Sequence, residues 1–301
     1  EDVVKVNFYG ANVDFEIGDK HNIRARKEKF VDFNHPDRFA GTVYQYASGS
    51  NGVSFISGSQ GDFEKYIPIT FETQVVLPNK IPWNEVYGFE TPHTKSVIAG
   101  MHRANPSNGN DYTIVSPDYC EIQLYTERDE KESKAVKFHL SSSVLGVHLT
   151  SSLYDDQYLN NEWYLAFKIK NDRHPTPDEV LSSSLAPQSY TIDFIGYNTE
   201  ANTVLNSFHL SASVTEANAH NFLNHSKRIY AGAKRTNFTG GLLERTDHKI
   251  GYVRFWMSEL SKDVMLRHAN DSTNYGPESP YESAYLMQED VNHIKVPQID
   301  T

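Results

Sequence analysis

Apolar and polar residues alternate with a period of two along much of this 301-residue chain. The alternation is clear at residues 4–9 and again at residues 135–140. Successive side chains of a strand point to opposite faces, so each such run predicts a β-strand with one buried face. Segments rich in Gly, Ser, Asn and Pro, such as 48–53 and 105–110, separate the runs and predict turns. Many short strands at this spacing predict an all-β sandwich or barrel.

Helical periodicity is confined to two short segments, residues 215–228 and residues 258–269. Neither is longer than about four turns, so we expect helices only at the periphery of the sheets. We divide the chain into three sections: an N-terminal strand and loop-rich arm (1–60) that belongs to the sandwich, the sandwich proper (61–275), and a Pro-punctuated C-terminal tail or linker (276–301).

Composition excludes several classes of function. The 38% hydrophobic and 12% aromatic content is enough for a packed core. A net charge of −11 disfavours nucleic acid and anionic membranes as partners, because both require clustered Lys and Arg. No run approaches the roughly 20 apolar residues of a membrane span, so we expect no membrane insertion. The single Cys120 leaves no intrachain disulfide, and we expect it to be a structural thiol on a strand.

The N-terminus has neither an initiator Met nor signal-peptide character. From this we expect a processed or excised piece of a longer protein.

The most informative part of the chain is residues 161–269. It contains a strand with Trp163 at 161–169, a strand before a Gly turn at 190–196, a small-residue strand at 229–233 and a strand ending in Trp256 at 250–256. Together with the strand at 71–77 and the helix at 258–269, this order resembles the concanavalin A-like lectin/glucanase superfamily, in particular its laminin-G-like members. The resemblance implies a jelly-roll sandwich of two antiparallel sheets, often with a glycan-binding concave face or rim. We expect six large side chains in its core: Trp163, Phe167, Phe194, Tyr252, Phe255 and Trp256.

A second resemblance concerns residues 230–240 (YAGAKRTNFTG) and 274–276 (NYG). These segments are similar to sandwich domains in large structural proteins of tailed marine phages. The resemblance implies a virion component such as a fibre, knob or capsid-decorating protein. Its partners would be other virion chains, with a homo-oligomer expected because a sandwich must cover its edges. The alternative location is extracellular, at a cell surface.

Residues 127–132 (ERDEKE) match the Glu-x-Asp-x-x-Glu pattern of the superfamily's glucanases. A glycoside hydrolase needs two carboxylates about 5 to 9.5 Å apart across the substrate. Here Arg128, Glu130 and Lys131 stand where apolar residues anchor the strand in the family. We therefore expect a solvated hairpin tip, and the sequence predicts no catalytic residue.

Metal and nucleophile motifs are also weak. Asp155 and Asp156 could help to hold Ca²⁺, but a solvated turn is the favoured interpretation, and we expect no other cofactor. No His-Glu-x-x-His occurs, and His220 and His225 are off a common helical face, so we expect the 13 histidines to be surface or hydrogen-bonded residues.

Aromatic residues beside polar loops are the better functional lead. Aromatic rings with short polar neighbours are suited to bind sugars, although such tyrosines also pack strand ends or interfaces. The sequence predicts a glycan-binding set of Tyr112, Tyr154, Asp155, Asp156, Tyr158 and Tyr197.

Three functional hypotheses follow. The leading one is a non-enzymatic virion protein for assembly or host-glycan attachment. The second is a free-standing carbohydrate-binding or adhesion module, and the third is a glycoside hydrolase or lyase.

Overall fold

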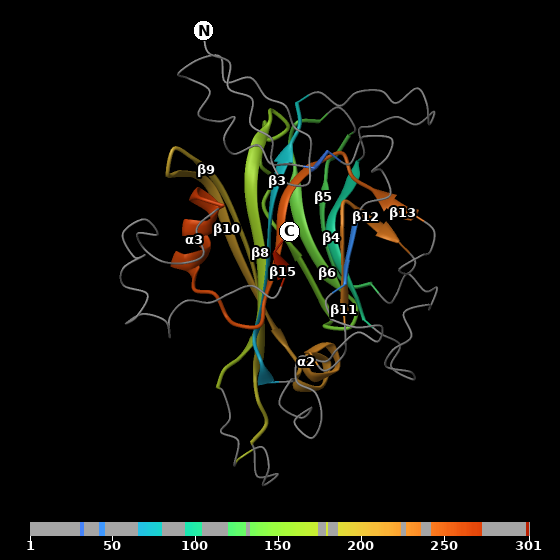
Figure 1. Cartoon of the computed structure of the whole chain (residues 1–301), viewed down its shortest axis with the longest axis vertical. Helices are drawn as coiled ribbons and strands as arrows, with labels where there is room; N and C mark the ends of the chain where they lie inside the picture. The colour runs from blue at the N-terminus through green and yellow to red at the C-terminus, as the bar shows by residue number, and fades with distance from the viewer. Residues whose placement is uncertain are drawn as a thin grey trace.

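The computed structural model describes residues 31–32, 42–45, 66–79, 94–103, 120–130, 133–173, 179, 186–223, 227–235, 242–272 and 299–300. Two antiparallel sheets face each other in this part of the chain, with short helices at the margins (Figure 1). The predicted all-β sandwich with peripheral helices is confirmed.

The seven-stranded sheet has the order β1-β14-β3-β8-β9-β10, and β15 also pairs with β14. Its strands are β1 (Val31–Asp32), β3 (Ile69–Leu77), β8 (Asn161–Asn171), β9 (Tyr190–Glu200), β10 (Thr203–Val214), β14 (Lys249–Trp256) and β15 (Ile299–Asp300). Every pair in it is antiparallel. β1 lies within the N-terminal section 1–60 and β15 within the C-terminal section 276–301, so both sections contribute a short strand to this sheet.

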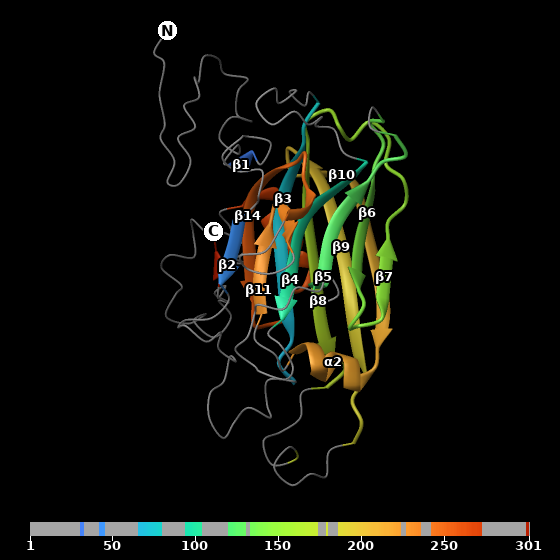
Figure 2. The same cartoon turned by 90° about the vertical axis from the view of Figure 1, so that its right-hand side faces the viewer.

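The six-stranded sheet has the order β2-β11-β4-β5-β6-β7. Its strands are β2 (Thr42–Gln45), β4 (Lys95–Arg103), β5 (Cys120–Glu127), β6 (Lys137–Ser142), β7 (Val147–Thr150) and β11 (Lys227–Ala231). Figure 2 looks onto this sheet, with β2 at the left and β7 at the right. A two-stranded ribbon of β12 (Ala233–Arg235) and β13 (Leu242–Arg245) contacts β4 and lies outside this sheet in Figure 1.

The main core fills the space between the sheets. Phe71 and Phe167 stack with ring centroids 5.1 Å apart within the seven-stranded sheet, and Phe138 of β6 lies 4.6 Å from Trp163 across the interior. Phe194 and Phe255 belong to the same cluster. The alternation of each strand therefore directs one set of side chains into a common interior, as the sequence predicts.

A second core lies on the opposite face of the seven-stranded sheet. There Tyr252 and Trp256 pack with Tyr164 and with Met265 of α3 (Lys262–Asn270). All six predicted core residues are buried. The prediction that Trp163 and Trp256 share one interior is wrong, because Trp256 is the next residue after the inward-facing Phe255 and so points to the other face.

The helices are short and lie close to the predicted segments. α2 (Glu216–Leu223) falls within 215–228 and buries Phe222 and Leu223, whereas α3 overlaps 258–269. Ser261 caps α3 by accepting a hydrogen bond from the backbone N–H of Val264. Among the residues placed by the structure, no helix has both the length and the apolar character needed to span a membrane.

Candidate functional site

The five residues of the predicted glycan-binding set that the structure describes do not gather their side chains in one place. Tyr112 lies outside the described residues. Tyr154 is half-buried: its ring is 4.9 Å from that of Trp163, and its hydroxyl donates to the Ser207 carbonyl at 3.0 Å. Burial raises the pKa of Tyr154. These contacts close the edge of the sandwich between β7 and β10.

Asp155 and Asp156 are exposed in the turn that precedes β8. Asp156 has a left-handed backbone with φ of 56°, and its carbonyl accepts a hydrogen bond from the Asn161 side chain at 3.2 Å. In the described segments, no three His, Cys, Asp or Glu side chains gather in a way that could hold a metal ion. The two carboxylates therefore face solvent from a well-formed turn.

Tyr158 and Tyr197 contact different interiors. Tyr158 is only 2% exposed, and its hydroxyl is 2.7 Å from His248 Nε2 between the sheets. Tyr197 is half-buried on the opposite face of the seven-stranded sheet, with its ring 6.2 Å from that of Tyr164. Burial raises the pKa of Tyr197, and the nearby Asp263 raises it further. Tyr158 is enclosed by protein, and Tyr197 packs against Tyr164 with part of its side chain exposed.

The acidic segment after β5 differs from its predicted form. Glu127 and Asp129 are exposed, but Arg128 between them is buried, so the predicted solvated tip is wrong at this residue. The Arg128 guanidinium donates to Asp247 Oδ2 and lies 4.0 Å from the Tyr158 ring centroid. The long Arg128 side chain turns inward because it pairs with the buried carboxylate of Asp247, which comes from a distant segment of the sequence. Glu132, the last residue of the motif, lies outside the described residues.

Asp247 is the centre of that buried cluster. Its Oδ1 accepts hydrogen bonds from Ser96 Oγ at 2.6 Å and from the Tyr158 hydroxyl at 3.2 Å. Burial raises the pKa of Tyr158 well above its ordinary value, and the Asp247 charge raises it further. The cluster ties β4, β5 and the start of β14 together from inside, so we assign it a structural role.

A second set of polar side chains gathers on the outer surface of the six-stranded sheet. The inward positions of β5 and β6 hold core residues such as Leu124 and Leu140, so the alternate positions face outward. We call this surface the polar face; it consists of Lys95, Gln123, Tyr125, Glu127, His139, Ser141, His148 and Thr150, with Lys234 and Glu244 of the β12–β13 ribbon beside it.

An aromatic stack forms the middle of the polar face. The rings of Tyr125 and His139 are 4.8 Å apart and nearly parallel, at 4°. Lys95 Nζ lies 4.3 Å from the Tyr125 ring centroid. Burial raises the pKa of Tyr125, and the carboxylates of Glu127 and Glu244 raise it further. The phenol is therefore neutral and serves as a hydrogen-bonding group.

Two histidines share a hydrogen-bonded chain at the edge of this stack. His139 Nδ1 is 3.3 Å from His148 Nε2 and 3.0 Å from Thr150 Oγ1, while His139 Nε2 is 3.2 Å from Glu127 Oε2. Burial lowers the pKa of His139, an effect that His148, Lys137 and Lys95 reinforce and Glu127 opposes. A neutral His139 that accepts at Nδ1 satisfies the contacts with His148 and Thr150, whereas Nε2 lies close to Glu127 without forming a hydrogen bond to it.

A charged group completes the other side of the polar face. Glu244 accepts from Lys95 Nζ at 3.1 Å and from Gln123 Nε2 at 2.8 Å, and Lys234 Nζ donates to Gln123 Oε1 at 3.3 Å. The side chains of Glu127, Lys95 and Glu244 are 54%, 39% and 29% exposed. The polar face thus offers solvent-accessible donors and acceptors of both charges, held on strands. The sequence carried a signal for the polar face, because polar or aromatic residues occupy the alternate positions 123, 125 and 127 of β5 and 137, 139 and 141 of β6.

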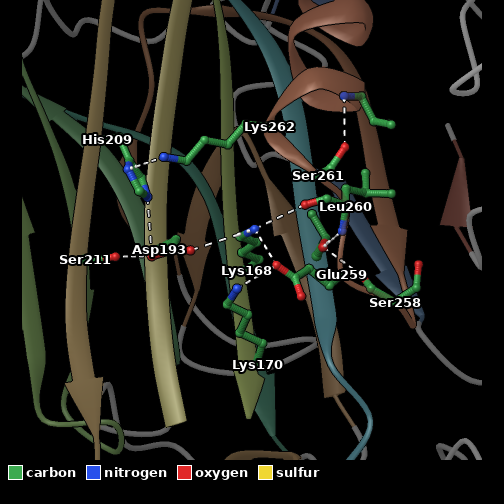
Figure 3. A network of polar contacts seen from close by, with 12 residues as sticks. Lys168, Lys170, Asp193, His209, Ser211, Ser258, Glu259, Leu260, Ser261 and Lys262 are labelled. Carbon is green, nitrogen blue, oxygen red and sulfur yellow. Dashed lines mark hydrogen bonds and ion pairs between the residues drawn. The ribbon is translucent and has the colours of Figure 1, made fainter. Parts of the chain in front are cut away.

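A further polar network crosses the outer surface of the seven-stranded sheet (Figure 3). The buried Lys168 lies 2.7 Å from Glu259 and 3.8 Å from Asp193, and Lys170 also contacts Glu259 at 2.8 Å. Lys168 Nζ also donates to the Leu260 carbonyl at 3.2 Å. This network fastens the segment before α3 to β8 and β9, which is a structural task.

Several solved structures overlap with this fold at a distance. No protein-family model matches the sequence, and no curated protein sequence matches it. A Trypanosoma rangeli sialidase in complex with 2,3-difluoro-KDN overlaps over 70% of this chain, with 10% identity and a TM-score of 0.33; this chain spans only 24% of that sialidase.

Two smaller modules overlap to a similar degree. The CBM40 of Ruminococcus gnavus IT-sialidase overlaps over 76% of this chain and 98% of its own, with 8% identity and a TM-score of 0.32. The CBM2 module of the evolved Dit of Lactobacillus casei BL23 phage J-1 overlaps over 64% and 62%, with 6% identity and a TM-score of 0.31. At these low identities and TM-scores, the overlaps do not indicate which ligand this chain binds or where the chain originates.

Proposed function

We propose that this chain is a non-enzymatic, glycan-binding sandwich of the concanavalin A-like type and that the polar face is its binding surface. The observation that carries the proposal is the arrangement of the solvent-accessible Lys95, Glu127, His148 and Thr150 side chains around the buried Tyr125–His139 stack. Oligosaccharides present many hydroxyl groups, and a surface of fixed donors and acceptors on strands is suited to bind them. The polar loops predicted from sequence supply no comparable cluster in the described residues.

The test is a binding experiment with a matched pair of variants. The full chain is applied to an array of neutral and acidic oligosaccharides, and the strongest binder is then titrated in solution. Lys95→Met removes a charged donor from the polar face, whereas Lys170→Met removes an equally exposed lysine, also paired with a glutamate, from the other sheet. We expect Lys95→Met to weaken binding about tenfold or more, because hydrogen bonds to charged groups contribute about 1.5–3 kcal/mol. Lys170→Met is expected to bind like the native chain.

Two results would count against the proposal. One is that no glycan binds, and the other is that both lysine variants bind as tightly as the native chain. Cleavage of a polysaccharide panel that is abolished by Glu127→Gln would favour the hydrolase hypothesis instead.

We further propose that the glycan-binding chain works as part of a phage virion, for assembly or host attachment. The support is the resemblance of residues 230–240 and 274–276 to sandwich domains of phage structural proteins. Electron microscopy and native mass spectrometry of the assembly that contains the chain test this. A repeated feature on a particle supports the virion role, and an isolated monomer that binds glycan favours the free-standing module.

A further inference from the structure

The strands β6 and β7 bring His139 and His148 together although nine positions separate them in sequence. In the register, His139 is opposite Thr150 and His148 is opposite Ser141, so the two histidines are diagonal neighbours on the polar face. Long side chains at diagonal positions can touch. Here His139 Nδ1 and His148 Nε2 are 3.3 Å apart.

That separation suits a metal ion. Two imidazole nitrogens bound to one ion at about 2.05 Å, with a tetrahedral angle between them, lie about 3.3 Å apart. The pair has this separation already, so metal binding requires the proton between the two nitrogens to leave or to move to His148 Nδ1, and the two lone pairs to turn toward a common point. We propose that His139 and His148 form a binding site for a late first-row transition-metal ion, such as Cu²⁺, Ni²⁺ or Zn²⁺.

A carboxylate supports the first of these histidines. Glu127 Oε2 lies 3.2 Å from His139 Nε2, the ring nitrogen that faces away from His148. Metal-binding histidines commonly donate their other N–H to a carboxylate, which fixes the tautomer and the ring orientation. In this structure Nε2 makes no hydrogen bond, but a small rotation of the exposed Glu127 side chain would let it accept from Nε2 and hold the lone pair of His139 on Nδ1, where the site needs it.

Oxygen atoms surround the two nitrogens. Thr150 Oγ1 is 3.0 Å from His139 Nδ1, and the Tyr125 hydroxyl is 3.3 Å from His148 Nε2. Within the described ranges no third His, Cys, Asp or Glu joins the pair as a metal ligand. We expect the two imidazoles to be the main ligands, with water in the remaining positions and the hydroxyls as hydrogen-bonding neighbours. Nitrogen ligands select Cu²⁺, Ni²⁺ and Zn²⁺ over Ca²⁺ and Mg²⁺.

The inference does not rest on glycan binding, although the site lies on the polar face. His148 is exposed, so an ion can reach the pair from solvent. The sequence predicted only dispersed or hydrogen-bonded histidines, because the pair belongs to no metal motif. Strand register alone creates it.

The test is titration of the full chain with Cu²⁺ in the absence of glycan. Calorimetry gives the number of sites, and electron paramagnetic resonance reports nitrogen ligands of the bound Cu²⁺. Because the chain has 13 histidines, the measurement is the difference between variants. His148→Ala is expected to remove one Cu²⁺ site, and Glu127→Gln to weaken that site about tenfold or more. His209→Ala, an exposed histidine of the other sheet that is hydrogen-bonded to Lys262, is expected to leave it intact.

The proposal is overturned if His148→Ala and the native chain bind the same number of Cu²⁺ ions with the same affinity. Circular dichroism checks that His148→Ala is folded, which its exposed position favours. His148→Gln, which keeps the size and a polar tip, provides a second measurement. Glycan binding assayed with a chelator present shows separately whether the proposed function stands.

Discussion

Replacing Arg128 with Met tests whether the buried Arg128–Asp247 pair holds the two sheets together. The side chains are 3% and 0% exposed, so Arg128→Met leaves the Asp247 carboxylate buried without its cation. Removing one partner of a buried ion pair costs about 3–5 kcal/mol. Ser96 and Tyr158 still donate to Asp247, which favours the lower end of that range.

Thermal and urea unfolding measure the effect. In a domain of this size, 1 kcal/mol corresponds to a Tm shift of about 2 °C, so we expect a loss of about 6–10 °C. Arg173→Met is the matched control, because Arg173 is 54% exposed and pairs with Glu179 at the surface at 2.9 Å. Exposed pairs contribute about 0–1 kcal/mol, so its Tm is expected to change little.

A double-mutant cycle separates the pair from its surroundings. Asp247→Asn alone removes the charge that Arg128 neutralises, and the double variant Arg128→Met/Asp247→Asn removes both charges. Residues in direct contact couple by about 0.5–3 kcal/mol, so the double variant should lose less stability than the sum of the single ones. The reasoning is refuted if Arg128→Met is no more destabilising than Arg173→Met, or if the two buried changes are additive.

Two further predictions concern the seven-stranded sheet. A Cβ on Gly196 would lie 2.5 Å from Cζ of Phe208 on the paired strand. Gly196→Ala should therefore lower the free energy of unfolding in urea by about 1–3 kcal/mol, and Phe208→Leu should partly restore it. A Gly196→Ala variant as stable as the native chain would contradict the tight packing. Burial alone would raise the pKa of Glu259, but hydrogen bonds and charges from Lys168 and Lys170 outweigh it and lower the pKa. A carboxyl group whose pKa is lower in the folded state stabilises the protein at pH values above its unfolded pKa of 4.5, and this stabilisation is lost as the pH falls through the folded pKa. Glu259→Gln should therefore make the Tm fall less steeply in acid. An unchanged dependence of Tm on pH would argue against these contacts.

The sandwich was predictable because its signal is local. Alternation with period two is a property of neighbouring residues, and it defined strands such as β6 without any knowledge of partners. The second core had a local signal as well. Adjacent aromatic residues at Trp163–Tyr164 and Phe255–Trp256 occupy both faces of one strand, which indicates a strand covered on both sides.

The polar contacts could not be predicted in the same way, because their partners are distant in sequence. Arg128 and Asp247 are 119 positions apart, and a charged run of residues is normally solvated. Only the packing of the two sheets against each other, which brings Asp247 beside β4 and β5, turns Arg128 inward. The glycan prediction likewise relied on tyrosines near polar loops, whereas Tyr158 is buried between the sheets and Tyr197 packs partly buried against Tyr164.

The difference in burial between the two sheets is the reason that we place the proposed binding surface on one of them. All nine residues of β3 are buried, and β8 is buried over most of its length, because the main core covers one face and α3 with its neighbouring segment covers the other. β7, by contrast, alternates between buried and exposed positions. A strand covered on both faces has no side chain left for a ligand, whereas the polar face presents the exposed Glu127, His148 and Thr150 around the buried side chains of its centre. Changes of the exposed residues of the polar face should therefore alter binding with little loss of stability, whereas changes on either face of β3 should do the reverse.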